Sequence, residues 1–389
     1  MTTSASLEAL LAEIRAMHGE SDIPLHRPVF VGNERRYVVE CIDSNFVSSV
    51  GARVTEFEQR VAAYTDCAHA VAVVNGTAAL HVALRLVGVQ RGDEVLTQAL
   101  TFVATCNALA YADAHPVFVD VDRDTMGMSP DALRAWLENH AERRTGGCWN
   151  RTTGRRLAAC VPMHTFGHPC RIEAILEVCK DWGIPLLEDA AESLGSRVGD
   201  RHTGSFGVMG TLSFNGNKVI TTGGGGMLLT NDPALAARAK HLTTTAKRPH
   251  AWEFFHDEVG YNYRLPNLNA ALGCAQMETL PAMLRVKADI AARYDAACRR
   301  LGIHYVKAPP GAATWLNSIV LDDQAQRDWF LKISNERKIM TRPIWRLMSR
   351  LPAFANCEHD GLHNSIWLEE RVVNIPSSVP DHLARNLTP

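Results

Sequence analysis

Lys218 lies between a strand-like run and a glycine-rich segment, a position suited to chemistry. It follows Ser213-Phe-Asn-Gly-Asn and precedes four consecutive glycines at 223–226. Glycine permits positive φ angles and close backbone approach, and a lysine amine held out of bulk water loses its charge more easily and attacks carbonyl groups. The pattern therefore predicts Schiff-base chemistry at Lys218. A glycine-rich hairpin with a solvated lysine beside it is the alternative.

A second motif, residues 75–80, has the residue types of an anion site. Asn75-Gly-Thr follows the apolar run 70–74 and begins a predicted helix. The free N–H groups of a helix start, the Thr77 hydroxyl and the open space at Gly76 suit a phosphate. An ordinary helix cap by Asn75 or Thr77 accounts for the same residues, so both interpretations stay open.

A third motif, Leu187-Glu-Asp-Ala-Ala-Glu192, also follows an apolar run. An acid such as Asp189 can hold a proton on a heteroaromatic nitrogen and so turn the ring into an electron sink. A helix cap at Asp189 is the alternative. Asp189 and Glu192 have no third ligand within reach in the sequence, so we predict no metal site.

The three motifs lie within a repeating pattern of strands and helices. Apolar runs alternate with predicted helices that begin at 78, near 102, at 130 and at 171; the runs are 70–74, 94–97, 116–120, 157–163 and 184–188. Repeated units of this kind predict an α/β fold with a mostly parallel sheet buried on both faces, whose sites lie at the carboxyl ends of the strands.

The flanking segments predict two domains. Residues 5–17 form an amphipathic helix, residues 138–156 a solvated surface loop, and residues 267–300 a long helix that contains Pro281. Short strands at 304–307 and 315–321 and a helix at 324–336 then indicate a small α+β domain. We predict an N-terminal arm and large domain over residues 1–266, and a bridging helix with a small domain over residues 267–389.

Composition excludes several classes of function. The 389 residues include 40 basic and 42 acidic side chains, a formal charge of −2, which argues against nucleic-acid binding and a polybasic membrane contact. Ten cysteines lack a CxxC pair, as is typical of reduced thiols. No run of about 18 apolar residues is long enough to cross a bilayer. We therefore predict a cytoplasmic protein.

Taken together, the motifs make the chain resemble the sugar aminotransferases of the DegT/DnrJ/EryC1/StrS family. The resemblance extends from Phe46-Val-Ser-Ser-Val-Gly51 to Asn374-Ile-Pro-Ser-Ser378. Ser-Phe-x-x-x-Lys at 213–218, Glu-Asp-Ala-Ala-Glu at 188–192 and Gly-Tyr-Asn-Tyr-Arg-Leu at 260–265 carry it. It implies a fold type I aminotransferase that uses pyridoxal 5′-phosphate, with a large cofactor-binding domain and a small C-terminal domain.

The resemblance also implies roles for individual residues. Lys218 would bond to the cofactor and then move a proton at the substrate carbon. Asp189 would pair with the pyridine nitrogen. Glu192, where many members of the family have glutamine, would face the phenolic oxygen of the cofactor or the sugar.

Other residues would bind the remaining parts of the cofactor. The phosphate would be held by Gly76, Thr77 and Ser213, and Phe102 would stack on the ring. In a homodimer with shared active sites, Asn262 would complete the phosphate site of the partner subunit.

The implied reaction moves an amino group from L-glutamate to a UDP- or GDP-linked 4-keto-6-deoxy sugar. Local segments of the sequence are most similar to those of enzymes that aminate sugars for bacillosamine, legionaminic acid or perosamine. This similarity indicates surface polysaccharide or lipopolysaccharide biosynthesis. An aminotransferase specific for C3 is an alternative, and a non-catalytic regulator or scaffold is another. Family members that dehydrate at C3 have histidine in place of the lysine, so Lys218 argues against them.

Three further residues stay outside the predicted site. His164 is open between a packing role and a substrate contact. Trp345 and Arg346 match a family stretch near the sugar, but a tryptophan after a strand usually packs in a core, so we interpret both as structural.

Overall fold

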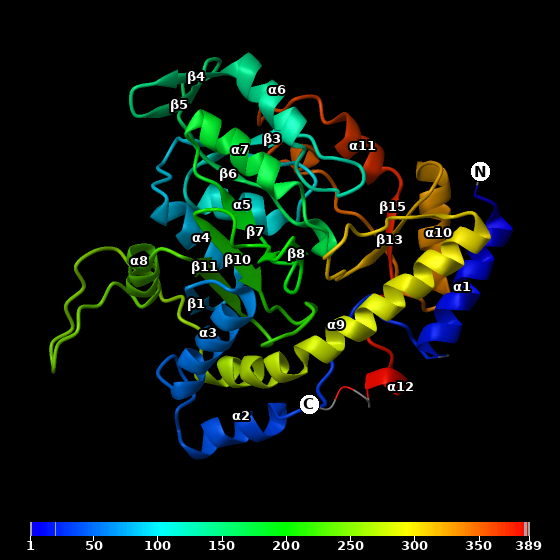
Figure 1. The fold of residues 1–389 in the computed structure, drawn as a ribbon, viewed down its shortest axis with the longest axis horizontal. Coiled ribbons are helices and arrows are strands. Elements are labelled where there is room, and N and C mark those ends of the chain that lie inside the picture. Colours follow the sequence, from blue (N-terminus) through cyan, green and yellow to red (C-terminus); the bar gives the residue numbers. More distant parts are fainter. Residues whose placement is uncertain (1, 20, 385–386, 388–389) are drawn as a thin grey trace.

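Parallel strands form the centre of the molecule, as Figure 1 shows. The structure, a computed structural model, describes residues 2–19, 21–384 and 387. Two sheets, with the orders β1-β11-β10-β7 and β3-β2-β6, adjoin through parallel bridges between Cys160 and Leu186 and between Met163 and Asp189. The strands are β1 (His69–Val73), β2 (Glu94–Gln98), β3 (His115–Val119), β6 (Leu157–Val161), β7 (Leu187–Asp189), β10 (Met209–Ser213) and β11 (Gly226–Thr230).

Among these seven strands, β11 runs opposite to its two neighbours, and the others share one direction. The predicted α/β fold with a mostly parallel sheet is confirmed. A shared direction brings the carboxyl ends of β1, β2, β6, β7 and β10 to one edge of the sheet. The motifs that follow these strands therefore meet there.

Both faces of the sheet are covered because side chains alternate along each strand. In β1, Val71 and Val73 pack in one cluster and Ala72 packs in another. The first cluster includes residues of α4 (Gly76–Leu86), α5 (Val103–Tyr111) and α8 (Pro233–Thr243). The opposite face is covered by α3 (Ala52–Thr65), α6 (Pro130–His140), α7 (Ile172–Trp182) and the start of α9 (Asn267–Leu301).

A smaller antiparallel sheet lies in the C-terminal part, in the order β12-β13-β15-β14. Its strands are β12 (His304–Tyr305), β13 (Asn317–Val320), β14 (Arg342–Pro343) and β15 (Val372–Ile375), and the helices nearby are α10 (Gln324–Glu336), α11 (His363–Glu369) and α12 (Asp381–Ala384). The long helix α9 runs past both sheets in Figure 1. The domain boundary at 266/267 stays a prediction.

The N-terminal helices pack on α9. Helix α1 (Ser4–His18) shares a core with α9, α10, β13 and β15, so the start of the chain packs with its C-terminal part. Helix α2 (Glu34–Asp43) contacts the first half of α9. Among the residues that the structure describes, no helix combines the length and apolar character needed to cross a bilayer.

The prediction of a surface loop over 138–156 is wrong in part. This segment contains a hairpin of β4 (Ala141–Arg144) and β5 (Gly147–Asn150), with Gly146 at φ 92° in the turn. The Asn150 amide is buried and donates to Glu94 Oε2 at 2.8 Å. Only β5 shows the alternation in burial that is typical of a strand, and the arginines and other polar residues around it favour a loop. Two short strands, β8 (Arg197–Val198) and β9 (Arg201–His202), form another hairpin.

Candidate active site

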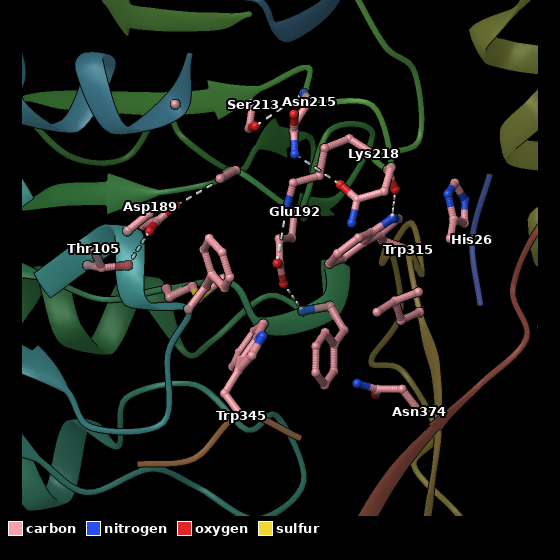
Figure 2. A pocket seen from close by; sticks show the side chains of 18 of the residues that line it. His26, Thr105, Asp189, Glu192, Ser213, Asn215, Lys218, Trp315, Trp345 and Asn374 are labelled. Carbon is pink, nitrogen blue, oxygen red and sulfur yellow. Dashed lines mark hydrogen bonds and ion pairs between the residues drawn. The ribbon is translucent and has the colours of Figure 1, made fainter. Parts of the chain in front are cut away.

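A cavity of about 770 Å³ lies where the strands of the central sheet end and the small sheet approaches. Its walls include residues that follow β1, β2, β6, β7 and β10, together with residues of the C-terminal part. Figure 2 shows Asp189, Glu192, Ser213 and Lys218 around the same space. The structure thus brings the three sequence motifs together.

Lys218 extends into this cavity from the turn that follows β10. Its side chain is 12% exposed, so it is not the solvated lysine of the alternative interpretation. Its Nζ lies 3.0 Å from Glu192 Oε1 and 4.0 Å from the centre of the Trp315 ring. The amine is therefore held between a carboxylate and an aromatic face.

The glycine-rich segment brings β11 against the start of α4. At Gly226, the first residue of β11, an added Cβ would lie 2.3 Å from the Asn75 carbonyl oxygen. Only glycine fits there. The glycines therefore act by letting two backbone segments approach each other, next to the predicted phosphate site.

The predicted anion site has the expected form at the start of α4. The Asn75 side chain caps the helix and accepts from the Ala78 N–H at 2.8 Å, so the capping interpretation also holds. Gly76 and Thr77 are the first two residues of the helix, and their N–H groups have no intrahelical acceptor. Gly76 lies so close to Ser213 that an added Cβ would be 3.1 Å from the Ser213 Cβ. The result is a small polar cradle at a helix N-terminus, which suits a phosphate.

Asp189 is the last residue of β7 and is 2% exposed. Its Oδ2 accepts from the Thr105 hydroxyl at 2.7 Å, and its Oδ1 accepts from the Ala191 N–H at 3.1 Å. The residues that follow form turns instead of a helix, so the helix-cap alternative is wrong. Burial raises the pKa of Asp189. A cationic group opposite this carboxylate would favour its ionised form.

Glu192 is buried beside Lys218. Its Oε2 accepts from the Phe166 N–H at 3.0 Å, while Oε1 contacts Lys218. Burial raises the pKa of Glu192, and the positive charge of Lys218 opposes that rise. This carboxyl is therefore well placed to exchange a proton with the amine.

The remaining predicted residues take different positions. Phe102 lines the cavity and is 48% exposed, so its ring is accessible to a ligand. Asn262 is exposed and is not among the residues that line the cavity of its own chain. Its predicted role toward the partner subunit stays a prediction.

Trp345 and Arg346 both line the cavity, and Trp345 also packs against the core, so their interpretation as structural stays a prediction. The Trp345 ring centre lies 4.7 Å from that of Phe166. His164 is fully buried, and its Nε2 lies 3.0 Å from Glu188 Oε2. His164 Nδ1 accepts from the Cys170 N–H at 3.2 Å and its Nε2–H donates to Glu188, so both ring nitrogens have partners within the fold and His164 is a packing histidine.

Sequence reasoning missed several residues that line the cavity, among them His26, Asn215, Trp315, Arg342 and Asn374. Most of them belong to segments far from Lys218 in the sequence. Trp315 was expected only as the start of a strand, and nothing in its spacing indicates that its ring reaches Lys218. The sequence Arg342-Pro-Ile-Trp-Arg346 could have indicated this side of the cavity. Two arginines beside a tryptophan, with no acidic residue in the segment, favour anion recognition.

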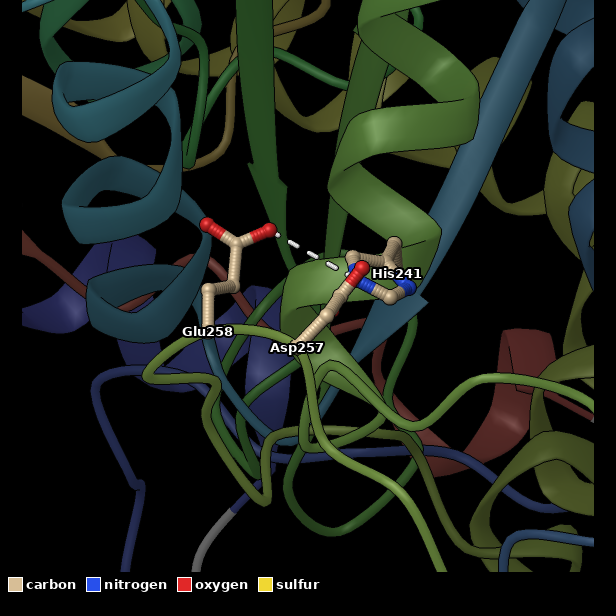
Figure 3. Close-up of side chains that lie close together, drawn as sticks. All are labelled: His241, Asp257 and Glu258. Carbon is tan, nitrogen blue, oxygen red and sulfur yellow. Dashed lines mark hydrogen bonds and ion pairs between the residues drawn. The ribbon is translucent and has the colours of Figure 1, made fainter.

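A group of possible metal ligands lies outside the cavity, at His241, Asp257 and Glu258 (Figure 3). His241 Nε2 lies 2.7 Å from Asp257 Oδ1. Arg248 donates to the other Asp257 oxygen at 2.7 Å, and Arg238 donates to both oxygens of Glu258. Because arginines already bind these carboxylates, we interpret the group as an ion-pair cluster.

The chain is similar to known proteins over most of its length. The chain matches the DegT/DnrJ/EryC1/StrS aminotransferase family over residues 30–383. It is 34% identical over 358 residues to GDP-perosamine synthase of Escherichia coli O157:H7, covering 91% of this chain and 93% of that protein. It is 36% identical over 352 residues to GDP-perosamine synthase of Caulobacter vibrioides, covering 88% and 90%.

The fold has close neighbours among solved structures. The aminotransferase TlmJ from Streptoalloteichus hindustanus superposes with a TM-score of 0.84 at 28% identity, covering 94% of this chain and 97% of that one. The chain is thus an aminotransferase of fold type I. It belongs to the DegT/DnrJ/EryC1/StrS aminotransferase family, and the predicted family is confirmed.

Aminotransferases of this family depend on pyridoxal 5′-phosphate, and the residues of this cavity fit that cofactor. Because Gly76 has no side chain, the space beside Ser213 that a Cβ would crowd stays open, as a phosphate requires. Asp189 is a buried carboxylate whose ionised form needs a cationic partner, as a protonated ring nitrogen would provide. Lys218 lies in the same cavity. When bound, the cofactor supplies an electron-withdrawing ring that stabilises negative charge on the substrate carbon.

Proposed function

We propose that this enzyme transfers an amino group from L-glutamate to a UDP- or GDP-linked 4-keto-6-deoxy sugar for surface polysaccharide or lipopolysaccharide biosynthesis. The observation that carries the proposal is a buried, carboxylate-paired Lys218 in one cavity with the exposed Arg342 and Arg346. Relatives named GDP-perosamine synthase support a nucleotide-linked sugar.

The size and charge of the cavity support substrates of this class. Its volume of about 770 Å³ is in the upper part of the range of about 300–1,000 Å³ for small-molecule sites. Arg342 and Arg346 lie on the side formed by the C-terminal part. Guanidinium groups bind phosphate and carboxylate oxygens in pairs, so this side suits the diphosphate of a nucleotide sugar and the carboxylates of glutamate.

The residues divide the work as follows. Lys218 would hold the cofactor in the resting enzyme and move a proton at the substrate carbon. Asp189 would favour a proton on the ring nitrogen, and Glu192 would exchange a proton with the Lys218 amine or face the phenolic oxygen. Gly76, Thr77 and Ser213 would hold the phosphate group, and Phe102 would pack against the ring.

We also propose a cytoplasmic homodimer with shared active sites. The segment that follows α8 extends away from the rest of the molecule in Figure 1. It exposes Trp252, Phe254 and Val259 at 83%, 77% and 85%. A cluster of exposed apolar side chains favours a protein contact. Asn262 follows in the same segment, so a partner subunit that covers these side chains also meets Asn262.

The test is product analysis with UDP-, GDP- and dTDP-linked 4-keto-6-deoxy sugars and L-glutamate. We expect a new C4 amine on one UDP or GDP sugar, identified by nuclear magnetic resonance, with 2-oxoglutarate as coproduct. An amine at C3 would instead support the C3-specific alternative. A protein that binds pyridoxal phosphate but transfers no amine to any sugar would favour a regulator or scaffold.

A further inference from the structure

Trp315 contacts the segment of Lys218 in two ways. Its indole Nε1–H donates to the carbonyl oxygen of Asn217, directly before Lys218, at 2.7 Å. Its ring centre lies 4.0 Å from Lys218 Nζ. Trp315 precedes β13 of the small sheet, whereas Lys218 follows β10 of the central sheet. One side chain therefore joins the two sheets at the amine (Figure 2).

Trp315 is itself held by a buried lysine on α9. The Lys287 Nζ donates to the Trp315 carbonyl at 2.9 Å and to the Ser377 carbonyl at 2.8 Å, and it lies 3.1 Å from His26 Nε2. The Lys287 amine thus has a polar partner in three directions, although the residue is almost completely buried and burial lowers its pKa to about 7.

The backbone of Trp315 is fixed on its other side as well. Its N–H donates to the Phe166 carbonyl at 2.8 Å. Phe166 in turn donates its N–H to Glu192, the carboxylate that pairs with Lys218. With the backbone fixed, the indole can turn away only by giving up its hydrogen bond to the Asn217 carbonyl, and a part-buried donor left without its partner is costly.

We propose that Trp315 is a positioning residue for Lys218. It anchors the carbonyl that precedes the lysine and covers one side of the amine, so that the amine reaches the cavity from the side of Glu192. Lys287 keeps Trp315 in place from behind. This inference rests on the role proposed for Lys218 and adds a residue from the small sheet to that role.

A lysine needs such support because its four-carbon stem has several rotatable bonds. Attack on a carbonyl carbon requires the amine within about 3–3.5 Å and in line, and a misplacement of about 1 Å can lower a rate roughly a hundredfold. The aromatic face also attracts the cationic amine. Loss of both contacts should therefore slow each step in which Lys218 reacts, with less effect on substrate affinity.

Three variants test the proposal. Trp315→Phe keeps an aromatic face but loses the N–H donor, and Trp315→Leu loses both. Trp136→Phe is the matched control, because Trp136 is a buried tryptophan of α6 in a separate core cluster. Each protein is freed of cofactor, and the rate of covalent attachment of pyridoxal phosphate is followed by absorbance. Borohydride reduction and peptide mass analysis then identify the lysine that carries the label.

We expect Trp315→Leu to attach the cofactor at least about tenfold more slowly and to lose kcat by a similar factor, while KM for L-glutamate changes by less than about threefold. Trp315→Phe should lie between wild type and Trp315→Leu. Trp136→Phe should match wild type in attachment rate and in kcat. A general loss of folding would impair cofactor attachment, kcat and substrate binding together. A positioning role lowers the attachment rate and kcat and leaves KM nearly unchanged.

Wild-type attachment rates and kcat in Trp315→Leu would overturn the proposal. If thermal unfolding shows that Trp315→Leu does not fold, Trp315→Phe decides, and an unchanged attachment rate in that variant would overturn it equally. A label on a lysine other than Lys218 in the wild-type protein is a different outcome. It would overturn the role proposed for Lys218, and with it the basis of this inference.

Discussion

The buried carboxylate of Glu192 and the part-buried amine of Lys218 form a pair, with 3.0 Å between Oε1 and Nζ. A lysine attacks a carbonyl as the neutral amine, so its ammonium form must first pass on a proton. Glu192 is the acceptor in contact with it. Because burial raises the pKa of Glu192, this carboxyl takes up a proton more readily than an exposed glutamate does.

The first prediction is that Glu192→Gln slows the attachment of pyridoxal phosphate, because an amide cannot accept that proton. We expect a rate roughly tenfold to a hundredfold lower near pH 6.5, within the range of general base catalysis. The difference should shrink as the pH rises, since hydroxide and buffer bases then compete with Glu192 as proton acceptors. Stopped-flow absorbance from pH 6 to 9 measures both rates. Parallel pH profiles for the two proteins would mean that Glu192 only holds Lys218 in place.

The second prediction concerns Lys218 itself. Purified protein with pyridoxal phosphate should be yellow, and L-glutamate should shift its absorbance band to shorter wavelength. Lys218→Ala should bind the cofactor without a covalent bond and show no turnover. Lys332→Ala is the control, because Lys332 is an exposed lysine of α10, far from Lys218 in the sequence, and does not line the cavity. Full turnover by Lys218→Ala would remove Lys218 from the mechanism.

The third prediction is that Asp189→Asn lowers the rate of transamination roughly a hundredfold or more, because each factor of ten corresponds to about 1.4 kcal/mol of transition-state stabilisation. An amide cannot keep the ring nitrogen protonated. The amide oxygen of the asparagine can accept from the Ala191 N–H, and its NH2 group can donate to the Thr105 hydroxyl, so the fold should persist. Asp124→Asn, at an exposed ion pair with Arg171, serves as the control. Near-normal kinetics in Asp189→Asn would leave Asp189 with a structural role only.

The sequence was sufficient to predict that motifs at the ends of neighbouring parallel strands lie close together. Gly76 follows β1, and Asp189 and Ser213 are the last residues of β7 and β10. These three strands share a direction, so the topology brings the residues to one edge. The same reasoning places Lys218, since it follows β10 by a short turn. Local sequence was sufficient because the sheet itself supplies the long-range arrangement.

The contribution of the small sheet could not be predicted in this way. Trp315 reaches Lys218 only because α9 and the buried Lys287 fix how the small sheet meets the central one. Such docking depends on tertiary contacts that leave no periodic pattern. The hairpin within 138–156 was missed for a different reason: the strands are short, the buried Cys148 and Asn150 alternate with Gly147 and Trp149 over only four residues, and the segment is rich in arginine.

The fourth prediction concerns stability in acid. Burial lowers the pKa of His168 to about 4, and neither ring nitrogen has a hydrogen-bond partner among the described residues. The unfolded chain takes up this proton near pH 6.5, whereas the folded chain takes it up only near pH 4. The free energy of unfolding should therefore fall as the pH drops from about 6.5 to 4, by at most about 3 kcal/mol for this residue, since one pKa unit is about 1.4 kcal/mol.

Urea unfolding of wild type and His168→Met between pH 4 and 7 measures this contribution. His18 and His202 have pKa values lowered in the same direction, so the informative quantity is the difference between the two proteins. That difference should grow in favour of His168→Met as the pH falls. His304→Met, an exposed control, should follow wild type. A constant difference across the pH range would show that His168 does not titrate in this window.

The fifth prediction tests the shared active site. Asn262 is exposed and lies outside the cavity of its own chain, whereas Lys218 lies inside it. If Asn262 serves the partner subunit, the variants Lys218→Ala and Asn262→Ala should complement each other. In a mixed dimer, one site then carries both defects and the other site carries neither.

Random mixing of equal amounts makes about half of the dimers mixed, each with one intact site of two, so activity should recover to roughly a quarter of wild type for a closed two-fold dimer. The experiment requires that Asn262→Ala by itself is badly impaired, and it requires subunit exchange by co-expression or by unfolding and refolding. A mixture no more active than the sum of the separate variants would place Asn262 in the fold of its own chain. Recovery near a quarter has no other simple source, because neither variant holds an intact pair of Lys218 and Asn262 in one chain.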